Sequence, residues 1–538
     1  MAPDRPPGAR SPEEAPVVTF DTDDALVVDL HTHNPWWDEG PAALAPGLPT
    51  RRRSDYYHLA RPDASDSQFE DQPLLGLVGH HGVGKTTLLE QFVYDRLTDG
   101  AEPERFCYVP FDADPLYQLR SDERLVRAIR YYEHSVLGRV ADPDPHFLLL
   151  DEVHRVEHPE KPGIDGWGTP VARTLEDHDD RHVVVTASAG IQVERELDRV
   201  DHPERDRDVR PILPEKFRDY LFGLYPPLED DDRRVTPTPV REGEGSLPAA
   251  LETDDPGRFV ETLRAQHDRV ADLARRIRSQ VPHYLAMGGL LSYDADGAIE
   301  DARDLEAAAY ERLAGDVRTA IYREVPGFES IRTVADLERL CTLAARNHGA
   351  PPVRYQRLVD LFDVDRRTLR NRYLSALAEL YLLTPVTEYD NARPRSVRLY
   401  LRDTGVANAL DDGDPRAALR DRDREAALAH LAAFDHTMRF AYGVEAVHGR
   451  ESPPNVQYWD GEEGTVAFVL EVDGQPVPVA LAYRPPADEA QVALEDFLAT
   501  YDAAVGLLVT GGTVGETDVI GRDGRVVEVP YWLYLMLC

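Results

Sequence analysis

The stretch "GHHGVGKTT", from Gly79 to Thr87, has the residue types and the spacing needed to hold a phosphate group. It fits the pattern G-x-x-x-x-G-K-[ST], in which glycines let the backbone amides turn inward toward an anion. Lys85 would reach the β- and γ-phosphates, and the Thr86 hydroxyl would bind Mg²⁺. Only three of the 60 basic residues are lysine, so composition does not explain a lysine here. The stretch predicts a site for ATP and Mg²⁺.

The sequence on either side of this loop predicts the elements that would position it. The apolar run 74–78 predicts a buried strand, and "TTLLEQFVYDRL" predicts an amphipathic helix whose N-terminus adds partial positive charge. We expect His80 and His81 to contribute backbone amides rather than to bind a metal. The predicted nucleotide-binding residues are Gly79, His80, His81, Gly82, Val83, Gly84, Lys85, Thr86 and Thr87.

Carboxylates follow a second predicted strand. "HFLLLDEVHRV" places Asp151 and Glu152 directly after an apolar run, and ligands of open parallel sheets bind at the carboxyl ends of strands. Asp151 would hold Mg²⁺ together with Thr86, and Glu152 would orient and deprotonate the attacking water. The next strand, "HVVVTASAG", ends in polar residues that would sense the γ-phosphate. The predicted catalytic residues are Lys85, Glu152 and Ser188.

These motifs, with others further along, resemble those of prokaryotic, largely archaeal, AAA-type P-loop ATPases that carry a winged helix and a C-terminal restriction-endonuclease-like domain. The segments that carry the resemblance are "TASAG", "ILPEKFRDYLF", "PHYLAMGG", "VRLYLRDTGVANAL" and "VEVPYWLYLMLC". The resemblance covers nearly the whole chain after residue 70. It implies an α/β fold with a P-loop NTPase parallel sheet, a helical lid, a winged-helix domain and a C-terminal α/β nuclease-like domain.

The composition of the chain is strongly acidic, because 98 Asp and Glu against 60 Lys and Arg give a formal net charge of −38. Hydrophobic residues still make up 42% and recur in patterned runs, which argues against a disordered acidic protein. A strongly negative surface stays soluble in concentrated salt, so we expect the cytoplasm of an extreme halophile. The cysteines form no CxxC pair, so we expect no cysteine metal site. The sequence shows neither the pattern of a leader peptide nor an apolar run long enough for a membrane span, so we expect neither export nor membrane insertion.

Changes in pattern along the chain predict six segments. Short apolar runs alternate with amphipathic stretches up to residue 225, as in a parallel sheet, and a mixture of proline, glycine and acidic residues follows. The predicted segments are a disordered N-terminus (1–16), the ATPase domain (17–225), a linker or loop (226–256), a helical lid region (257–330), the winged helix (331–412) and the nuclease-like domain (413–538).

The predicted winged helix carries the one clearly basic stretch. Residues 351–400 contain nine arginines and six acidic residues, and a helix, a turn near 363–365 and a second helix are expected there. We expect either contact with duplex DNA or a role as lid or spacer between domains. The arginines available for DNA are Arg366, Arg367, Arg370 and Arg372.

The nuclease-like domain resembles its family in pattern but not in its metal-binding residues. Nucleases of this class need an aspartate on one hairpin strand and Glu-x-Lys on the next to hold Mg²⁺ and activate water. In "TVAFVLEVDGQPVPVALAYR" those positions are Ala467, Ala480 and Ala482, and Asp473 lies in the hairpin turn. We therefore predict no nuclease activity and a role in binding a protein partner.

An H-x-H pair near the N-terminus is the one competing motif. His31 and His33 stand in "ALVVDLHTHNPWW", an arrangement that opens some metal-dependent hydrolases. No matching series of later ligands follows, so we expect an N-terminal strand whose "NPWW" packs on the ATPase core. The sequence as a whole predicts an ATP-hydrolysing molecular switch. The alternative is a DNA-binding regulator in which the nucleotide is structural.

Overall fold

The computed structural model describes most of the chain. The described residues are 24–49, 52, 56, 59, 73–112, 122–141, 145–156, 166–176, 181–199, 207–229, 233, 235, 256–290, 302–411, 420–447, 455–472, 474–484, 486–518 and 525–537. The predicted disordered segment 1–16, most of the predicted linker 226–256, and Asp473 lie outside them.

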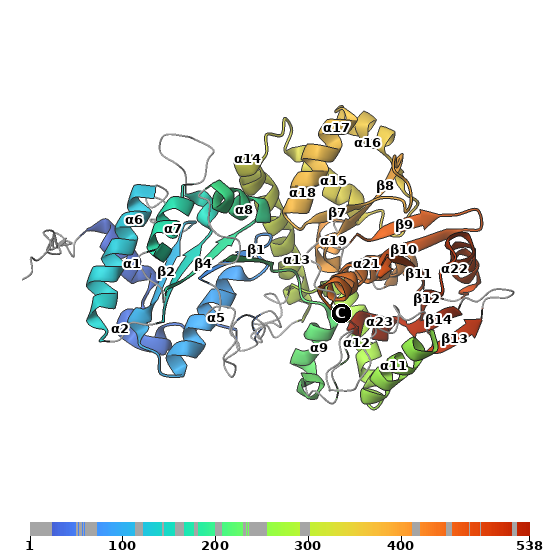
Figure 1. Ribbon diagram of the computed structural model, residues 1–538, viewed down its shortest axis with the longest axis horizontal. Helices are drawn as coiled ribbons and strands as arrows, with labels where there is room; N and C mark the ends of the chain where they lie inside the picture. The colour runs from blue at the N-terminus through green and yellow to red at the C-terminus, as the bar shows by residue number, and fades with distance from the viewer. Residues whose placement is uncertain are drawn as a thin grey trace, which may run out of the picture.

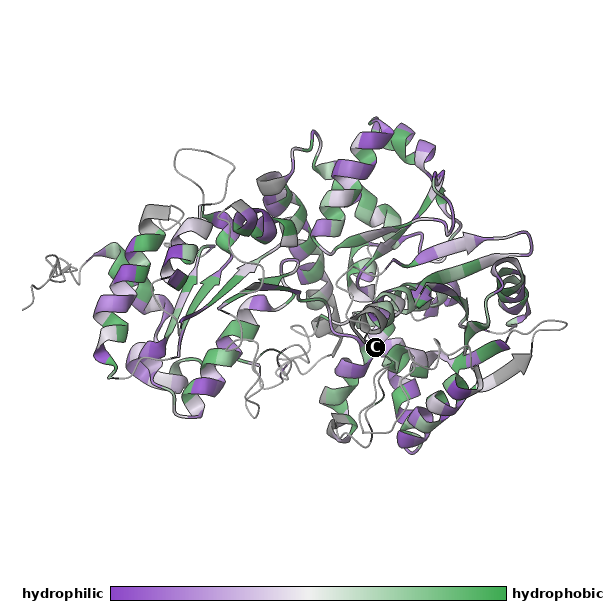
Figure 2. Cartoon of the chain, viewed as in Figure 1, coloured by the Kyte–Doolittle hydropathy of each residue, from purple (hydrophilic) through white to green (hydrophobic). Residues whose placement is uncertain are grey.

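A five-stranded parallel sheet forms the core of the N-terminal half (Figure 1). Four of its strands are buried because nearly every residue in them is apolar, as Figure 2 shows by their green colour, whereas the fifth, an edge strand at residues 207–211, carries charged residues and is partly exposed. The spatial order is β2-β3-β4-β1-β5, so β4 lies between the strand before the phosphate loop and the strand before the acidic pair. The strands are β1 (Leu74–Val78), β2 (Phe106–Pro110), β3 (His146–Asp151), β4 (Arg181–Ala187) and β5 (Arg207–Pro211).

Helices cover both faces of this sheet. They are α5 (Lys85–Thr98), α6 (Asp122–Tyr131), α7 (Gly168–Glu176) and α8 (Gly190–Arg199), whereas α9 (Phe217–Leu224), which follows the last strand, packs against helices of the C-terminal half. The parallel strands and their crossover helices give the α/β fold of a P-loop NTPase, as predicted.

The predicted N-terminal strand is wrong, because residues Ala25–His33 form helix α1. The β-branched residues favour a strand locally, but tertiary contacts stabilise the helix. The Asn34 side chain donates to the Tyr108 carbonyl at 2.8 Å and accepts from the Tyr108 amide at 2.7 Å, so it pairs with edge strand β2 as a strand would. The Trp37 indole donates to the Phe106 carbonyl at 2.9 Å. The segment does pack on the ATPase core, in short helix α2 (Trp36–Glu39) and the residues before it.

The H-x-H histidines make ordinary packing contacts in α1. His31 Nε2 lies 2.9 Å from the Tyr131 hydroxyl, and burial lowers the pKa of His33. Across the described ranges, no group of three or more histidine, cysteine or acidic side chains is arranged to hold a metal ion.

Helices connect the two halves of the molecule. The longest of these, α13, continues through the π-helical turn η11 and the short α14, and in Figure 1 it runs between the parallel sheet and the C-terminal half. The elements are α11 (Pro256–Arg269), α12 (Ala274–Met287), α13 (Ala302–Thr319), η11 (Ala320–Glu324) and α14 (Val325–Phe328).

Residues 335–410 combine helices with a small antiparallel sheet of order β6-β8-β7. Two helical segments flank a turn in which Asp363 has φ 50° and Asp365 caps the second segment through the Arg367 and Thr368 amides. The elements are α15 (Ala335–Ala345), β6 (Val353–Arg354), α16 (Tyr355–Phe362), α17 (Arg366–Thr368), η12 (Leu369–Leu374), α18 (Ser375–Glu379), β7 (Leu383–Val386), β8 (Ser396–Leu401) and α19 (Thr404–Leu410).

A second, mixed sheet forms the core of the last part of the chain, with the order β13-β14-β12-β11-β10-β9. Strands β10 and β11 make the predicted hairpin, in which Val472 pairs with Gln475. The elements are α21 (Arg422–Val447), β9 (Gln457–Asp460), β10 (Thr465–Val472), β11 (Gln475–Ala482), α22 (Asp488–Tyr501), β12 (Val505–Thr510), β13 (Gly515–Asp518), β14 (Arg525–Pro530) and α23 (Tyr531–Met536).

The segment after β5 ties the two halves together. The Ile212 amide donates to the Val78 carbonyl at 2.7 Å, directly before the phosphate loop. Five residues on, the Phe217 amide donates to Nε2 of His436 on α21 at 3.0 Å, and Arg439 of the same helix donates to the Pro214 carbonyl. The parallel sheet and the C-terminal half therefore meet at 212–217. In the part of the chain described, no helix has the length and apolarity needed to cross a bilayer.

Candidate nucleotide-binding site

The phosphate loop joins the end of β1 to the start of α5. Two of its glycines, Gly82 and Gly84, have φ of 80° and 99°, in the left-handed region that side chains with a Cβ rarely adopt. Gly84 is the N-cap of α5, and no side chain caps the amides of the first turn there. Those amides therefore point into the loop, where an anion can accept from them.

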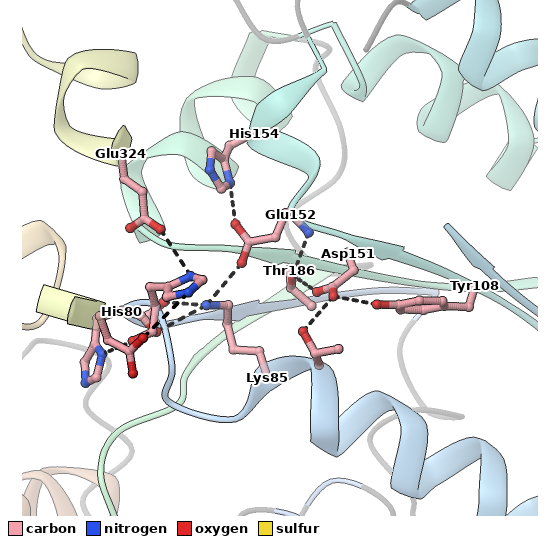
Figure 3. Close-up of polar contacts among 12 residues, drawn as sticks. His80, Lys85, Tyr108, Asp151, Glu152, His154, Thr186 and Glu324 are labelled. Atoms are coloured by element: carbon pink, nitrogen blue, oxygen red, sulfur yellow. Dashed lines mark hydrogen bonds and ion pairs between the residues drawn. The ribbon is translucent and has the colours of Figure 1, made fainter. Parts of the chain in front are cut away.

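Lys85, the first residue of α5, lies inside this loop and is only 4% exposed. Its Nζ donates to the Gly79 carbonyl at 2.7 Å and lies 3.4 Å from the His80 carbonyl (Figure 3). The same nitrogen is 3.5 Å from Glu152 Oε1. The ammonium group thus bridges the phosphate loop and the acidic pair of β3.

Asp151, at the end of β3, accepts from three hydroxyl groups (Figure 3). Thr86 donates to its Oδ2 at 2.7 Å, Tyr108 donates to the same oxygen at 2.8 Å, and Thr186 donates to Oδ1. Burial and the neighbouring Glu152 raise the pKa of Asp151, while the three hydroxyls oppose that rise. The structure therefore brings the two predicted metal ligands, Thr86 and Asp151, into direct contact.

Glu152 has left-handed backbone geometry, with φ 58°, which is uncommon for a residue other than glycine. Its amide donates to Thr186 Oγ1 at 2.9 Å, and its Oε2 lies 3.4 Å from His154 Nδ1. Burial alone would raise the pKa of this carboxyl, but Lys85 and His154 outweigh burial and lower the pKa to about 2. Glu152 is therefore a carboxylate aimed at Lys85, and the strained backbone fits a functional role.

Acidic side chains that the sequence did not predict come from α13 and η11, which lie within the predicted helical lid region 257–330. Asp316 of α13 and Glu324 of η11 flank the His81 imidazole, at 3.8 Å from Nε2 and 3.9 Å from Nδ1 respectively. His81, for which only a backbone role was expected, contacts both carboxyls with its side chain. Ser188, predicted to sense the γ-phosphate, lies close to Glu324, and its hydroxyl lowers the pKa of that carboxyl.

Glu90 is another residue near the site that the sequence analysis did not single out. It lies on α5, one turn after Thr86. Burial, with Asp151 nearby, raises the pKa of Glu90 to about 7. In the sequence, Glu90 looks like an ordinary polar residue of the predicted helix. The packing of α5 on β3 brings it near the site.

The positions predicted for the lost nuclease ligands do not line one surface. Ala467 belongs to the main hydrophobic core, whereas Ala480 and Ala482 belong to a separate cluster that packs against α22. The pairing of β10 with β9 is irregular between Val466 and Val469, which changes the face that side chains occupy. This irregularity accounts for Ala467 joining a different cluster from Ala480 and Ala482.

The four arginines of the predicted recognition helix differ in their surroundings. Arg366 and Arg370 lie over the ring of Tyr355, at 4.6 and 5.8 Å from its centroid. Arg372 donates to a backbone carbonyl before α15 at 3.1 Å. All four side chains are exposed to solvent. Three of the four side chains are thus held by contacts within the chain.

Comparison of the sequence with protein families agrees with this geometry. Residues 71–221 match the family described as AAA domain, so this segment is similar to P-loop domains of AAA type. Residues 300–417 match a family described as a domain of unknown function, DUF8612. No curated protein sequence matches the chain.

The solved structures that match the chain share little sequence with it. The Walker-type ATPase PABY2304 of Pyrococcus abyssi has 12% identity and a TM-score of 0.38, over 68% of this chain and 98% of its own. The Aeropyrum pernix ORC1 protein, solved in complex with DNA, has 16% identity and a TM-score of 0.28, over 71% and 98%. Thermotoga maritima RuvB has 13% identity and a TM-score of 0.22, over 69% and 91%.

Proposed function

We propose that the protein is a Mg²⁺-dependent ATPase that couples its nucleotide state to the conformation of its C-terminal half. The observation that carries the proposal is the bridge from the phosphate loop to the acidic pair, in which Lys85 contacts both the Gly79 carbonyl and Glu152. A phosphate loop and a strand-end acid so placed can bind a triphosphate and attack it with water.

The donor set at the end of β3 fits a magnesium ion. Thr86 and Asp151 supply the hydroxyl and carboxylate oxygens that Mg²⁺ prefers, and they are already 2.7 Å apart. Asp151 is buried among hydroxyls without a cationic partner at hydrogen-bonding distance in the described residues, so a divalent cation would offset its charge. Bound there, Mg²⁺ would neutralise charge on the phosphate oxygens.

Glu152 would position and deprotonate the attacking water. A carboxyl with a pKa near 2 is a weak base, and Lys85 is the strongest of the groups that keep it so low. A phosphate group in the loop attracts the lysine ammonium. The pKa of Glu152 would then rise toward a value suited to accepting a proton, so binding would activate the base.

The proposal is tested by ATP turnover in purified protein at molar KCl. We expect phosphate release with Mg²⁺ and none when EDTA removes the metal, because Asp151 and Thr86 cannot neutralise the developing charge themselves. Turnover that continues at the same rate in EDTA would contradict the assignment of these two residues.

The alternative function is a DNA-binding regulator in which nucleotide is structural. It is favoured by the exposed Arg367 and by the basic balance of residues 351–400 in an otherwise acidic chain. Arg366, Arg370 and Arg372 are exposed as well, so their contacts within the chain leave them accessible to a phosphate. Under this alternative, loss of turnover in a Glu152 variant would leave the protein's activity on DNA unchanged.

The predicted winged-helix and nuclease-like domains also remain proposals. The helices and three-stranded sheet of residues 335–401 and the hairpin of β10 and β11 are compatible with them. We propose that the C-terminal sheet binds a protein partner and does not cut DNA.

A further inference from the structure

Helix α13 and its π-helical end η11 lie across the phosphate loop. A methyl group added at Gly82 would meet Asp316 Oδ2 at 2.3 Å, so this carboxylate rests directly on the loop backbone. Glu324, two helical turns further along, approaches Nδ1 of His81, whereas Asp316 approaches Nε2. The two acids therefore approach the loop from one helical run, and the π turn sets the position of the second.

The Glu324 carboxyl is buried in the same place that an anionic ligand would approach. Its side chain is 0% exposed, and neither oxygen makes a hydrogen bond of ordinary length and angle with the residues described. Burial and Glu152 raise the pKa of Glu324, while Lys85, Ser188 and His81 favour its charged form. The groups that attract this carboxyl include the lysine expected to bind phosphate.

We propose that Asp316 and Glu324 form an acidic plug that competes with nucleotide phosphates for the phosphate loop, so that ATP binds only when α13–η11 moves away. A triphosphate brings several negative charges, and like charges a few ångströms apart in a partly buried site repel by an amount on the order of 1 kcal/mol or more. The plug therefore sets the apparent affinity for ATP. This inference rests on the proposed function, because it assumes that the loop binds phosphate.

Movement of the plug would reach the C-terminal half, because α13 packs along α19. Its Tyr310 hydroxyl donates to the Ala286 carbonyl at the end of α12. From the other side, Asn408 of α19 donates to the same carbonyl at 2.9 Å, and Asp403 accepts from the Gly289 amide at 2.7 Å. Displacing α13 thus disturbs contacts that hold α12 and α19 together.

The test is the affinity of a fluorescent ATP analogue for Asp316→Asn, Glu324→Gln and the double variant. Each change keeps the shape of the side chain and removes its charge. We expect the double variant to bind about 10-fold tighter than the unmodified protein, and each single variant to lie between them. Glu311→Gln is the matched control, because Glu311 is an exposed acid on the same helix.

Each outcome decides the proposal. A tighter double variant that loses the gain when Lys85→Ala is added supports the plug, and a gain that survives Lys85→Ala overturns it. Equal or weaker binding by the double variant overturns the plug while leaving ATP binding intact. No binding by any of these proteins, each with an unchanged melting temperature, overturns both the plug and the proposed function.

Discussion

Glu152→Gln is expected to bind ATP at least as tightly as the unmodified protein and to hydrolyse it about 10²- to 10⁴-fold more slowly. The glutamine amide fills the same space and can still accept hydrogen bonds from its neighbours, but it cannot take a proton from water. Because Gln lacks charge, the Lys85 ammonium loses its 3.5 Å partner, and this should strengthen rather than weaken its attraction to phosphate. Phosphate release and equilibrium binding, measured side by side at molar KCl, check both halves of the prediction.

A surface variant separates this effect from general damage. Glu194→Gln changes an exposed acid on α8 by the same chemistry and should leave turnover unchanged. Turnover in Glu152→Gln equal to that of the control would remove the catalytic assignment. It would favour the alternative in which nucleotide is structural.

Lys85→Ala is expected to weaken ATP binding by about 10- to 100-fold, since a hydrogen-bonded contact with a charged group contributes about 1.5–3 kcal/mol. The loss removes the one buried cation of the loop and leaves Glu152 beside it without an ion-pair partner on that side. The lost cation and the uncompensated carboxylate both weaken the binding of an anion such as ATP. Isothermal titration with ATP and with ADP should show the larger loss for ATP.

The chain offers a matched control for this variant. Lys216→Ala removes another of the three lysines, whose Nζ lies 3.9 Å from Asp219 and far from the nucleotide site along the chain. It should bind ATP normally. Because an unpaired buried carboxylate destabilises the fold, thermal melts of both variants are needed. A folded Lys85→Ala protein with unchanged affinity would contradict the predicted role.

The sequence predicted the phosphate loop and the acidic pair because each is a local pattern. Glycines at fixed offsets and apolar runs before Gly79 and Asp151 determine the strand ends, and the parallel sheet brings those ends together. The predicted contact between Thr86 and Asp151 follows from the same logic. That those two residues and Glu152 bind metal and water stays a prediction.

Features that depend on distant contacts could not be predicted in this way. Asp316 and Glu324 contact His81 from more than 230 residues further along the chain. Nothing in the sequence of their helical segment distinguishes it from other acidic amphipathic helices. The left-handed backbone of Glu152 has no signature in residue type. The β-branched residues of α1 are common in strands, and they predict a strand there. The Asp24 cap and the contact of Asn34 with β2 stabilise the helix instead.

Hydrogen exchange on Glu152→Gln is the most direct measurement of the central claim, that ATP changes the conformation shared by the two halves. This variant should hold ATP without consuming it, so the bound state can be compared with the ADP-bound and nucleotide-free states. We predict that ATP speeds amide exchange in residues 316–324 and in α19, because the acidic helix leaves the phosphate loop. Identical exchange in these segments for all three states, at saturating nucleotide, would contradict the account of this protein as an ATP-dependent switch.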